Sequence, residues 1–173
     1  FSIKELKQIV DKTNACMIWG GALELVPADS KIISVEKILN IDPEANLLAS
    51  IMSKKLAVGS KYILIDIPYG KSAKVNKAKA LQLKKKFEYL GRYYYKQLKV
   101  VLTDGSQPIG NGIGPILELI DVIKILNPKE TGPKDLEDKS IFLAAQLLEM
   151  TGKAKKQKGA ELAREIIDSG KAF

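Results

Sequence analysis

The chain has 173 residues, 46% of them hydrophobic and 28% charged, which indicates one core-forming domain with room for a small lobe and excludes wholesale disorder. It contains no histidine and one cysteine, Cys16, so imidazole-based catalysis or metal binding, an internal disulfide and a Cys-x-x-Cys site are excluded. Apolar runs such as residues 62–65 break far short of the ~20 residues that a membrane helix needs, and the cysteine usage is typical of a reduced, cytoplasmic setting.

The net charge of +8 is concentrated in one segment. Between Lys71 and Lys99 there are ten basic residues and one acid, Glu88. We interpret this segment as a solvated, lysine-rich helix face, although a surface for a phosphate-bearing partner is the alternative. The chain has only two arginines, Arg92 and Arg164, and arginine supplies most bidentate contacts to bases and phosphates. We therefore expect no nucleic acid partner, and no membrane partner.

In the first third of the chain, periodicity and capping residues predict two helices. The first covers residues 3–12, where Ser2 and Glu5 can form a capping box, and residues 16–19 are typical of a short buried strand. The second helix begins at Asp42-Pro43, with Asp42 as the N-cap, and runs to about Val58 before Gly59 ends it. The pattern does not settle the secondary structure of residues 27–41.

The rest of the chain alternates strands with helices. Residues 61–67 form the clearest strand, and their continuous apolar character predicts burial on both faces. An amphipathic helix is expected over residues 76–95, and a second buried strand over 99–103. The apolar stripe of that helix comprises Ala80, Leu83, Phe87, Leu90 and Tyr94. Further helices are expected at about 115–126, 134–150 and 155–169. This alternation predicts an α/β fold, a parallel sheet with helical crossovers, together with a partial helical lobe.

Three places have residues suited to ligand binding. Two loops, residues 66–74 and the glycine-rich residues 103–115, follow the predicted strands at the edge where parallel α/β folds bind ligands. Glycine lets backbone N–H groups approach an anion, but it is first of all a turn residue, so both interpretations stay open. The third place is the helix after Asp42, where Ser50 and Lys54 are four residues apart and share a face.

Seven short motifs occur in one order along the chain. They are Trp19-Gly20-Gly21-Ala22, Pro27-Ala28-Asp29, Ile41-Asp42-Pro43, Leu48-Ala49-Ser50-Ile51-Met52-Ser53-Lys54-Lys55, Asp66-Ile67-Pro68-x-Gly70-x-x-Ala73-Lys74, Gln107-Pro108-Ile109-Gly110-x-x-Ile113-Gly114-Pro115 and Ser169-Gly170-Lys171-Ala172. In this order and spacing they resemble the thymidine/pyrimidine nucleoside phosphorylase family, and specifically its archaeal AMP phosphorylase branch. The resemblance covers nearly the whole chain.

The resemblance implies a domain division and a reaction. By analogy, residues 27–58 belong to a helical lobe, and residues 1–26 and 59–173 to an incomplete α/β domain that faces it. The chain is then the central piece of a larger enzyme, inactive alone because it lacks the phosphate-binding segment. The reaction is phosphorolysis, in which AMP and phosphate give adenine and ribose 1,5-bisphosphate. The resemblance implies no cofactor and no metal, small-molecule substrates, and a homo-oligomer in the complete enzyme.

The family's site residues match four positions here. Asp42 matches the proton donor to the departing base, although a plain N-cap is the alternative for this residue. Ser50 and Lys74 match residues that contact the nucleotide. Lys54 matches a lysine that faces the base in the pyrimidine branch.

One departure bears on the substrate. Pyrimidine enzymes hold the base with an arginine between the Pro-Ala-Asp motif and the Ser-Ile-x-x-Lys-Lys motif, whereas this chain has no arginine before Arg92. This favours AMP over a pyrimidine nucleoside. Two alternatives stay open: a pyrimidine nucleoside (thymidine) phosphorylase, and a nucleotide- or phosphate-binding module without catalysis.

Overall fold

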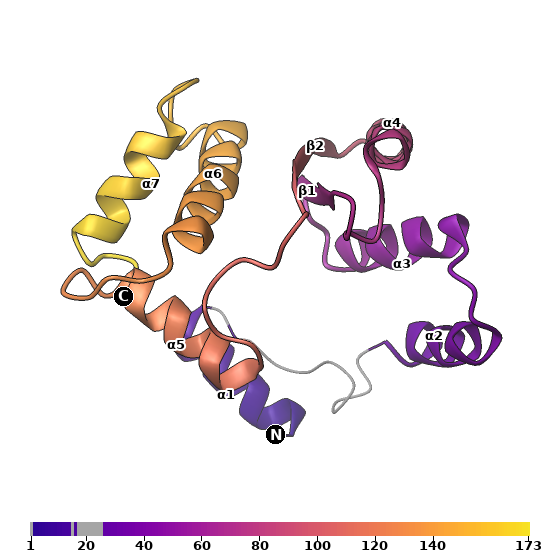
Figure 1. Cartoon of the computed structure of the whole chain (residues 1–173), viewed down its shortest axis with the longest axis horizontal. Helices are drawn as coiled ribbons and strands as arrows, with labels where there is room; N and C mark the ends of the chain where they lie inside the picture. Colours follow the sequence, from indigo (N-terminus) through magenta and orange to yellow (C-terminus); the bar gives the residue numbers. More distant parts are fainter. Residues whose placement is uncertain (1, 15, 17–25) are drawn as a thin grey trace. The chain divides into compact units, whose positions relative to one another are not determined.

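A computed structural model of the whole chain describes all residues except 1, 15 and 17–25 (Figure 1). It consists of two compact units, Phe1–Lys54 and Lys55–Phe173. The strand predicted over residues 16–19 lies outside the described residues, apart from Cys16, which belongs to no helix or strand. The division into a lobe of residues 27–58 and an α/β domain of the remainder stays a prediction. No helix in the described part of the chain is long and apolar enough to cross a membrane.

The described part of the first unit is helical. It contains α1 (Ile3–Thr13), α2 (Pro27–Leu39) and most of α3 (Glu44–Ala57). The predicted capping box of α1 is confirmed, because Ser2 Oγ accepts a hydrogen bond from the Glu5 N–H and Glu5 Oε2 accepts one from the Ser2 N–H. Helix α2 fills the region that the sequence pattern left open. It begins at Pro27, whose fixed φ suits the first position of a helix.

Helix α3 begins slightly later than predicted. The Leu47 N–H donates to the carbonyl of Pro43 at 3.1 Å, so Pro43 takes the N-cap position and Asp42 lies one residue before it. The end of α3 is as expected: Gly59 has a φ of +70°, the left-handed conformation that commonly terminates helices.

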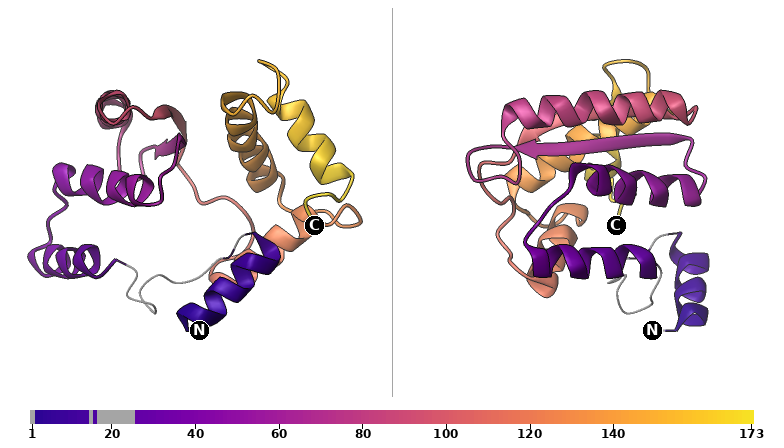
Figure 2. Two further views of the ribbon diagram at one scale, coloured as in Figure 1. Left: turned by 180° about the vertical axis from the view of Figure 1, so that it is seen from behind. Right: turned by 90° about the vertical axis from the view of Figure 1, so that its right-hand side faces the viewer.

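The second unit is an α/β arrangement, which confirms the predicted fold class. Its elements are β1 (Tyr62–Tyr69), α4 (Lys77–Tyr93), β2 (Gln97–Asp104), α5 (Pro115–Leu126), α6 (Lys134–Met150) and α7 (Gly159–Asp168). Strands β1 and β2 pair in parallel, from Tyr62 opposite Gln97 to Tyr69 opposite Asp104. Helix α4 forms the crossover, and α4 and α6 lie on opposite sides of the two strands (Figures 1 and 2). Helix α7 packs on α6.

The core of this unit differs from the prediction in two respects. Strand β1 alternates between buried residues (Ile63, Ile65, Ile67) and half-buried ones, so burial on both faces was wrong. The physical reason is that the second face includes Asp66, which forms an ion pair with Lys139 of α6. The stripe of α4 is buried at Ala80, Leu83 and Phe87, but Leu90 is only half-buried and Tyr94 is exposed, because the helix ends at Tyr93.

Helix α4 ends in a left-handed turn at a tyrosine. The Lys96 N–H donates to the Gly91 carbonyl at 2.8 Å, and the Tyr95 N–H donates to the Arg92 carbonyl at 3.1 Å. These are the two hydrogen bonds of a Schellman motif, which usually has glycine at its left-handed position. Tyr95 occupies that position with a φ of +53°. Its side chain is 95% exposed, so side-chain packing offsets little of the backbone strain.

We predict that Tyr95→Gly stabilises the protein. A left-handed conformation costs a residue with a Cβ roughly 1–2 kcal/mol, and the larger entropy of unfolded glycine cancels part of the gain. The net increase in the free energy of unfolding is expected to be about 1 kcal/mol, which corresponds to a rise in Tm of roughly 2–4 °C. Thermal unfolding followed by circular dichroism measures it. Tyr95→Ala is the control, because it removes the ring but keeps the Cβ, and an equal gain in that variant would contradict the backbone explanation.

Candidate functional site

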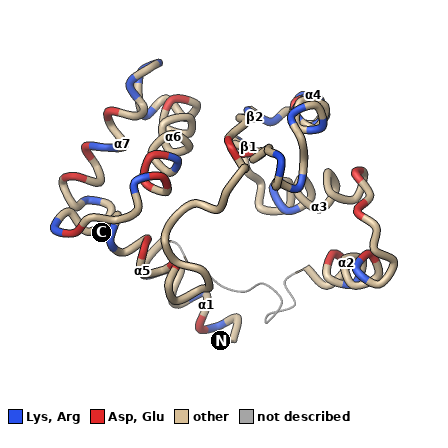
Figure 3. Tube along the Cα trace, viewed as in Figure 1, with Lys and Arg blue, Asp and Glu red and all other residues tan. Residues whose placement is uncertain are grey.

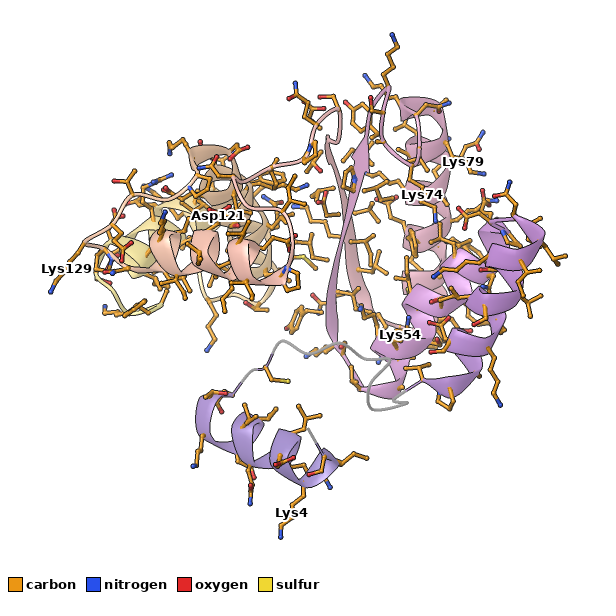
Figure 4. All side chains as sticks on the ribbon, turned by 60° about the horizontal axis from the view of Figure 1, so that its bottom comes forward. Lys4, Lys54, Lys74, Lys79, Asp121 and Lys129 are labelled. Carbon is orange, nitrogen blue, oxygen red and sulfur yellow. The ribbon has the colours of Figure 1, made fainter. Side chains whose placement is uncertain are left out.

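Three polar side chains of the first unit form a connected group, which we call the α2–α3 cluster: Asp29, Ser50 and Lys54. Ser50 and Lys54 lie on one face of α3, as their spacing predicted, and Lys54 Nζ donates to Ser50 Oγ at 3.0 Å. The same ammonium forms an ion pair with Asp29 Oδ2 of α2 at 2.7 Å. Figure 4 labels Lys54 on the ribbon. The structure therefore brings two of the four predicted site residues together.

Asp29 is the member of the cluster that sequence reasoning missed. It lies in the first turn of α2, where the helix dipole favours a carboxylate. Hydrogen bonds from Lys54, and to a lesser degree from Ser50, lower the pKa of Asp29 below its usual value, so the carboxyl group is ionised at neutral pH. The Pro-Ala-Asp motif contains this residue, but no local pattern could indicate a partner on another helix.

The other two predicted residues lie in loops. Asp42 is exposed and lies in the connection between α2 and α3. Lys74 belongs to the second unit and is exposed in the loop between β1 and α4 (Figure 4). The functional roles of all four residues stay predictions.

The first candidate loop is shorter than expected, because β1 continues to Tyr69. Asp66 is therefore a strand residue, and its carboxylate accepts a hydrogen bond from Thr103 Oγ1 at 2.7 Å and pairs with Lys139 Nζ at 2.9 Å. It connects β1, β2 and α6. Gly70 lies so close to the second loop that a Cβ there would come within 2.8 Å of the Ser106 backbone nitrogen. Both motif residues thus have structural roles: Asp66 connects the strands to α6, and Gly70 allows the two loops to approach closely.

The glycine-rich second loop is held by the protein's own carboxylates. The N–H groups of Asn111 and Gly112 both donate to Asp121 Oδ2, at 2.7 Å each. The Gly110 N–H donates to Asp135, and the Gly114 N–H donates to Glu118. These four backbone donors are already used, and the carboxylates around them repel an anion. The turn interpretation is therefore favoured for this loop over a phosphate cradle.

Beside this loop, the second unit has a pocket of about 520 Å³ at the carboxyl end of β2. Its polar lining includes Thr103, Ser106, Asp135 and Lys139, and Phe142 and Ile109 supply apolar surface. The position is one at which parallel α/β folds bind ligands. Sequence reasoning found the loop but missed the contribution of α6, because the packing of α6 against β1, which brings Lys139 to the strands, is not visible in local spacing.

The basic segment of the sequence extends over the loop before α4 and over α4 itself (Figure 3). The buried residues of α4 are Ala80, Leu83, Phe87 and Gly91, so its lysines occupy the remaining helix surface. Lys77 and Lys85 are exposed, and Lys84 pairs with Glu88 on the same helix. This distribution favours the solvated helix face over a site for a specific partner.

We predict that Asp121 is required for stability. Its side chain is 5% exposed, and its removal leaves two backbone donors without an acceptor, at a cost of about 1–3 kcal/mol each. Asp121→Ala should therefore lower the free energy of unfolding by roughly 2–5 kcal/mol, and Asp121→Asn by less, because an amide oxygen still accepts. Urea denaturation measures both. Glu118→Gln is the control, since its bond to Gly114 is exposed. A loss in Glu118→Gln as large as that in Asp121→Ala would contradict the assignment.

Comparison with known proteins places the chain beside phosphorylases, although no family model matches it. It is 49% identical over 172 residues to a "putative thymidine phosphorylase" of Bradyrhizobium diazoefficiens. It is also 49% identical over 173 residues to an "AMP phosphorylase" of Pyrococcus furiosus, and 46% identical over 171 residues to one of Methanococcus vannielii. These matches cover 98–99% of the chain but 34% of each relative. The chain thus spans about a third of the length of these relatives. The resemblance predicted from the motifs is confirmed.

Proposed function

We propose that this chain belongs with the thymidine phosphorylases and AMP phosphorylases that it resembles and takes part in the phosphorolysis of AMP. The products are adenine and ribose 1,5-bisphosphate, so the reaction is a pentosyl transfer from a base to phosphate. The observation that carries the proposal is the 49% identity to an AMP phosphorylase over 173 residues. The α2–α3 cluster supports it, because Ser50 and Lys54 were both predicted as substrate contacts and lie within hydrogen-bonding distance of each other.

The chemistry defines what the site must do. A phosphate oxygen forms a bond to the anomeric carbon of the ribose while the bond from that carbon to the base nitrogen breaks. The electron pair of the breaking bond passes to the base, which leaves more readily when it receives a proton. A positioned general acid contributes typically about 10²–10⁴-fold to such a step. In our proposal, Asp42 is that acid and donates the proton to the departing base.

The remaining proposed site residues bind the nucleotide. The Lys54 ammonium supplies a hydrogen-bond donor, and the Ser50 hydroxyl lies beside it; such groups suit the polar atoms of a base. The Lys74 ammonium, in a loop at the carboxyl end of β1, suits an oxygen-rich part of the nucleotide. We infer that the carboxylate-held second loop contributes shape rather than anion binding.

Thymidine phosphorolysis is the second candidate. The observation in its favour is the 49% identity to a "putative thymidine phosphorylase", as high as that to the AMP phosphorylase. The observation against it is that the chain has no arginine before Arg92, so the base-holding arginine of the pyrimidine enzymes has no counterpart. We therefore favour AMP.

The substrate is tested with the protein as encoded in its gene. The protein is incubated with phosphate and either AMP or thymidine, and the released base is measured by chromatography. We expect adenine to be released at least about tenfold faster than thymine, because a site that lacks the polar group for one base discriminates strongly against it. Faster release of thymine would support the second candidate, and binding of AMP without release of any base would support the non-catalytic module.

The general acid is tested by Asp42→Asn. This substitution removes the proton but changes an exposed position conservatively, so the Tm should stay close to that of the wild type, within about 1 kcal/mol of stability. The kcat for AMP should fall by roughly 10²-fold or more. Steady-state kinetics and thermal unfolding of the same preparation measure both. Glu44→Gln, two residues further along, is the control. If Asp42→Asn keeps the wild-type kcat, the acid is another residue.

A further inference from the structure

Two polar contacts join α2 to α3, one near each end of the helix pair. Asp29 in the first turn of α2 pairs with Lys54 near the end of α3 at 2.7 Å. Glu36 near the end of α2 accepts a hydrogen bond from Asn46 Nδ2 near the start of α3, also at 2.7 Å. The two helices are therefore antiparallel, and both contacts contribute to holding them together. Only the first contact includes a residue proposed to bind the nucleotide.

The two partners of the Asp29–Lys54 pair differ in burial. The Asp29 side chain is 14% exposed and that of Lys54 is 40% exposed, so the carboxylate is half-buried while the ammonium is more accessible. An ammonium has three N–H donors. Asp29 and Ser50 each accept one, and among the described residues we find no partner for the third. With 40% of its side chain exposed, Lys54 is accessible to a ligand.

The contacts with Asp29 and Ser50 change how Lys54 can bind a ligand. A free lysine side chain has about 2 kcal/mol of rotamer entropy, much of which is lost when a ligand immobilises it. Asp29 and Ser50 have already restricted the side chain before a ligand binds, and such preorganisation increases affinity. In addition, the charges of Lys54 and ionised Asp29 compensate each other. A compensated pair attracts a phosphate dianion weakly, but its N–H still donates to a neutral acceptor such as a base nitrogen or oxygen.

We propose that Asp29 is a positioning residue that holds Lys54, with Ser50 beside it, as a charge-compensated hydrogen-bond donor for the base, and not the phosphate, of the bound nucleotide. This inference rests on the proposed function and extends it by giving a role to the Asp of the Pro-Ala-Asp motif. That Lys54 faces the base is what the family resemblance implies. Asp29 acts through Lys54 and donates no proton itself, because it is ionised at neutral pH.

A double-mutant cycle tests this role in the protein as encoded, with AMP and phosphate as substrates. Asp29→Ala should raise the KM for AMP about tenfold and change kcat less, as expected for lost ground-state and transition-state binding. In a Lys54→Ala background, the same substitution should change KM by less than about twofold, because the residue through which it acts is gone. Asp29→Asn keeps an acceptor but loses the charge, so its KM for AMP should lie between that of the wild type and that of Asp29→Ala.

Inhibition by parts of the substrate identifies the group that Lys54 recognises. Adenine alone should inhibit Asp29→Ala about tenfold more weakly than the wild type, in line with the KM change. Ribose 5-phosphate, which carries the phosphate but no base, should inhibit both proteins equally. Glu36→Ala is the matched control: it breaks the other contact between α2 and α3, so it should lower the Tm but leave the KM and both inhibition constants unchanged.

The outcomes separate this inference from the proposed function. A wild-type protein that cleaves no nucleotide overturns the proposed function and, with it, the role of Asp29. With an active wild type, independent effects of Asp29→Ala and Lys54→Ala overturn the positioning role alone. An equal rise in KM in Glu36→Ala overturns it too, since Asp29 would then only hold the helices together. Weaker inhibition by ribose 5-phosphate in Asp29→Ala overturns the assignment of Lys54 to the base.

Discussion

The parallel pairing of β1 with β2 is the constraint on which the second unit depends. Two parallel neighbours cannot be joined by a hairpin, so the chain must return along the sheet through a crossover, here α4. Both strands then end at the same edge, and the loops after Tyr69 and Asp104 are neighbours although the sequence separates them. A Cβ on Gly70 would collide with the backbone at Ser106, which shows how closely these loops approach. The candidate pocket lies at this edge because the strand direction places it there.

Three carboxylates among the described residues connect parts of the chain that are distant in sequence or lie on different elements. Asp66 connects β1 to β2 and α6, and Asp121 fixes the glycine-rich loop through two backbone N–H groups. Asp29 orients Lys54. In each case a charged acceptor binds two donors from other parts of the chain, and such hydrogen bonds are stronger than neutral ones. The glycine-rich loop shows the consequence: its composition suits anion binding, but a buried carboxylate already occupies the place that an anion would take.

Local signals predicted the elements well where they were strong. Gly114 stands directly before α5, which begins at Pro115, and Gly132-Pro133 stands directly before α6; the starts of both helices were predicted at the observed residues. Helix α2 was missed because no side chain caps its start at Val26. The sequence did not indicate that α4 ends before Tyr95, because a bulky residue occupies the left-handed position where glycine is usual. The i, i+4 spacing was sufficient for Ser50 and Lys54, whereas the contacts of Asp29 and Lys139 depend on tertiary packing that local patterns do not encode.

Under the proposed function, the lysines around α4 and Lys54 have different roles: the first attract an anionic substrate, and the second recognises its base. The excess of +8 arises from the segment around α4, whose lysines occupy its solvated surface. Such a field attracts a phosphate-bearing substrate over distance and is screened within about 8 Å at physiological ionic strength. Lys54 adds little to that field, because Asp29 compensates its charge at 2.7 Å. Its contribution is a short, directional hydrogen bond, which bulk salt weakens far less. A chain rich in lysine can thus attract anions broadly and still reserve one lysine for a neutral base, provided that this lysine has its own carboxylate.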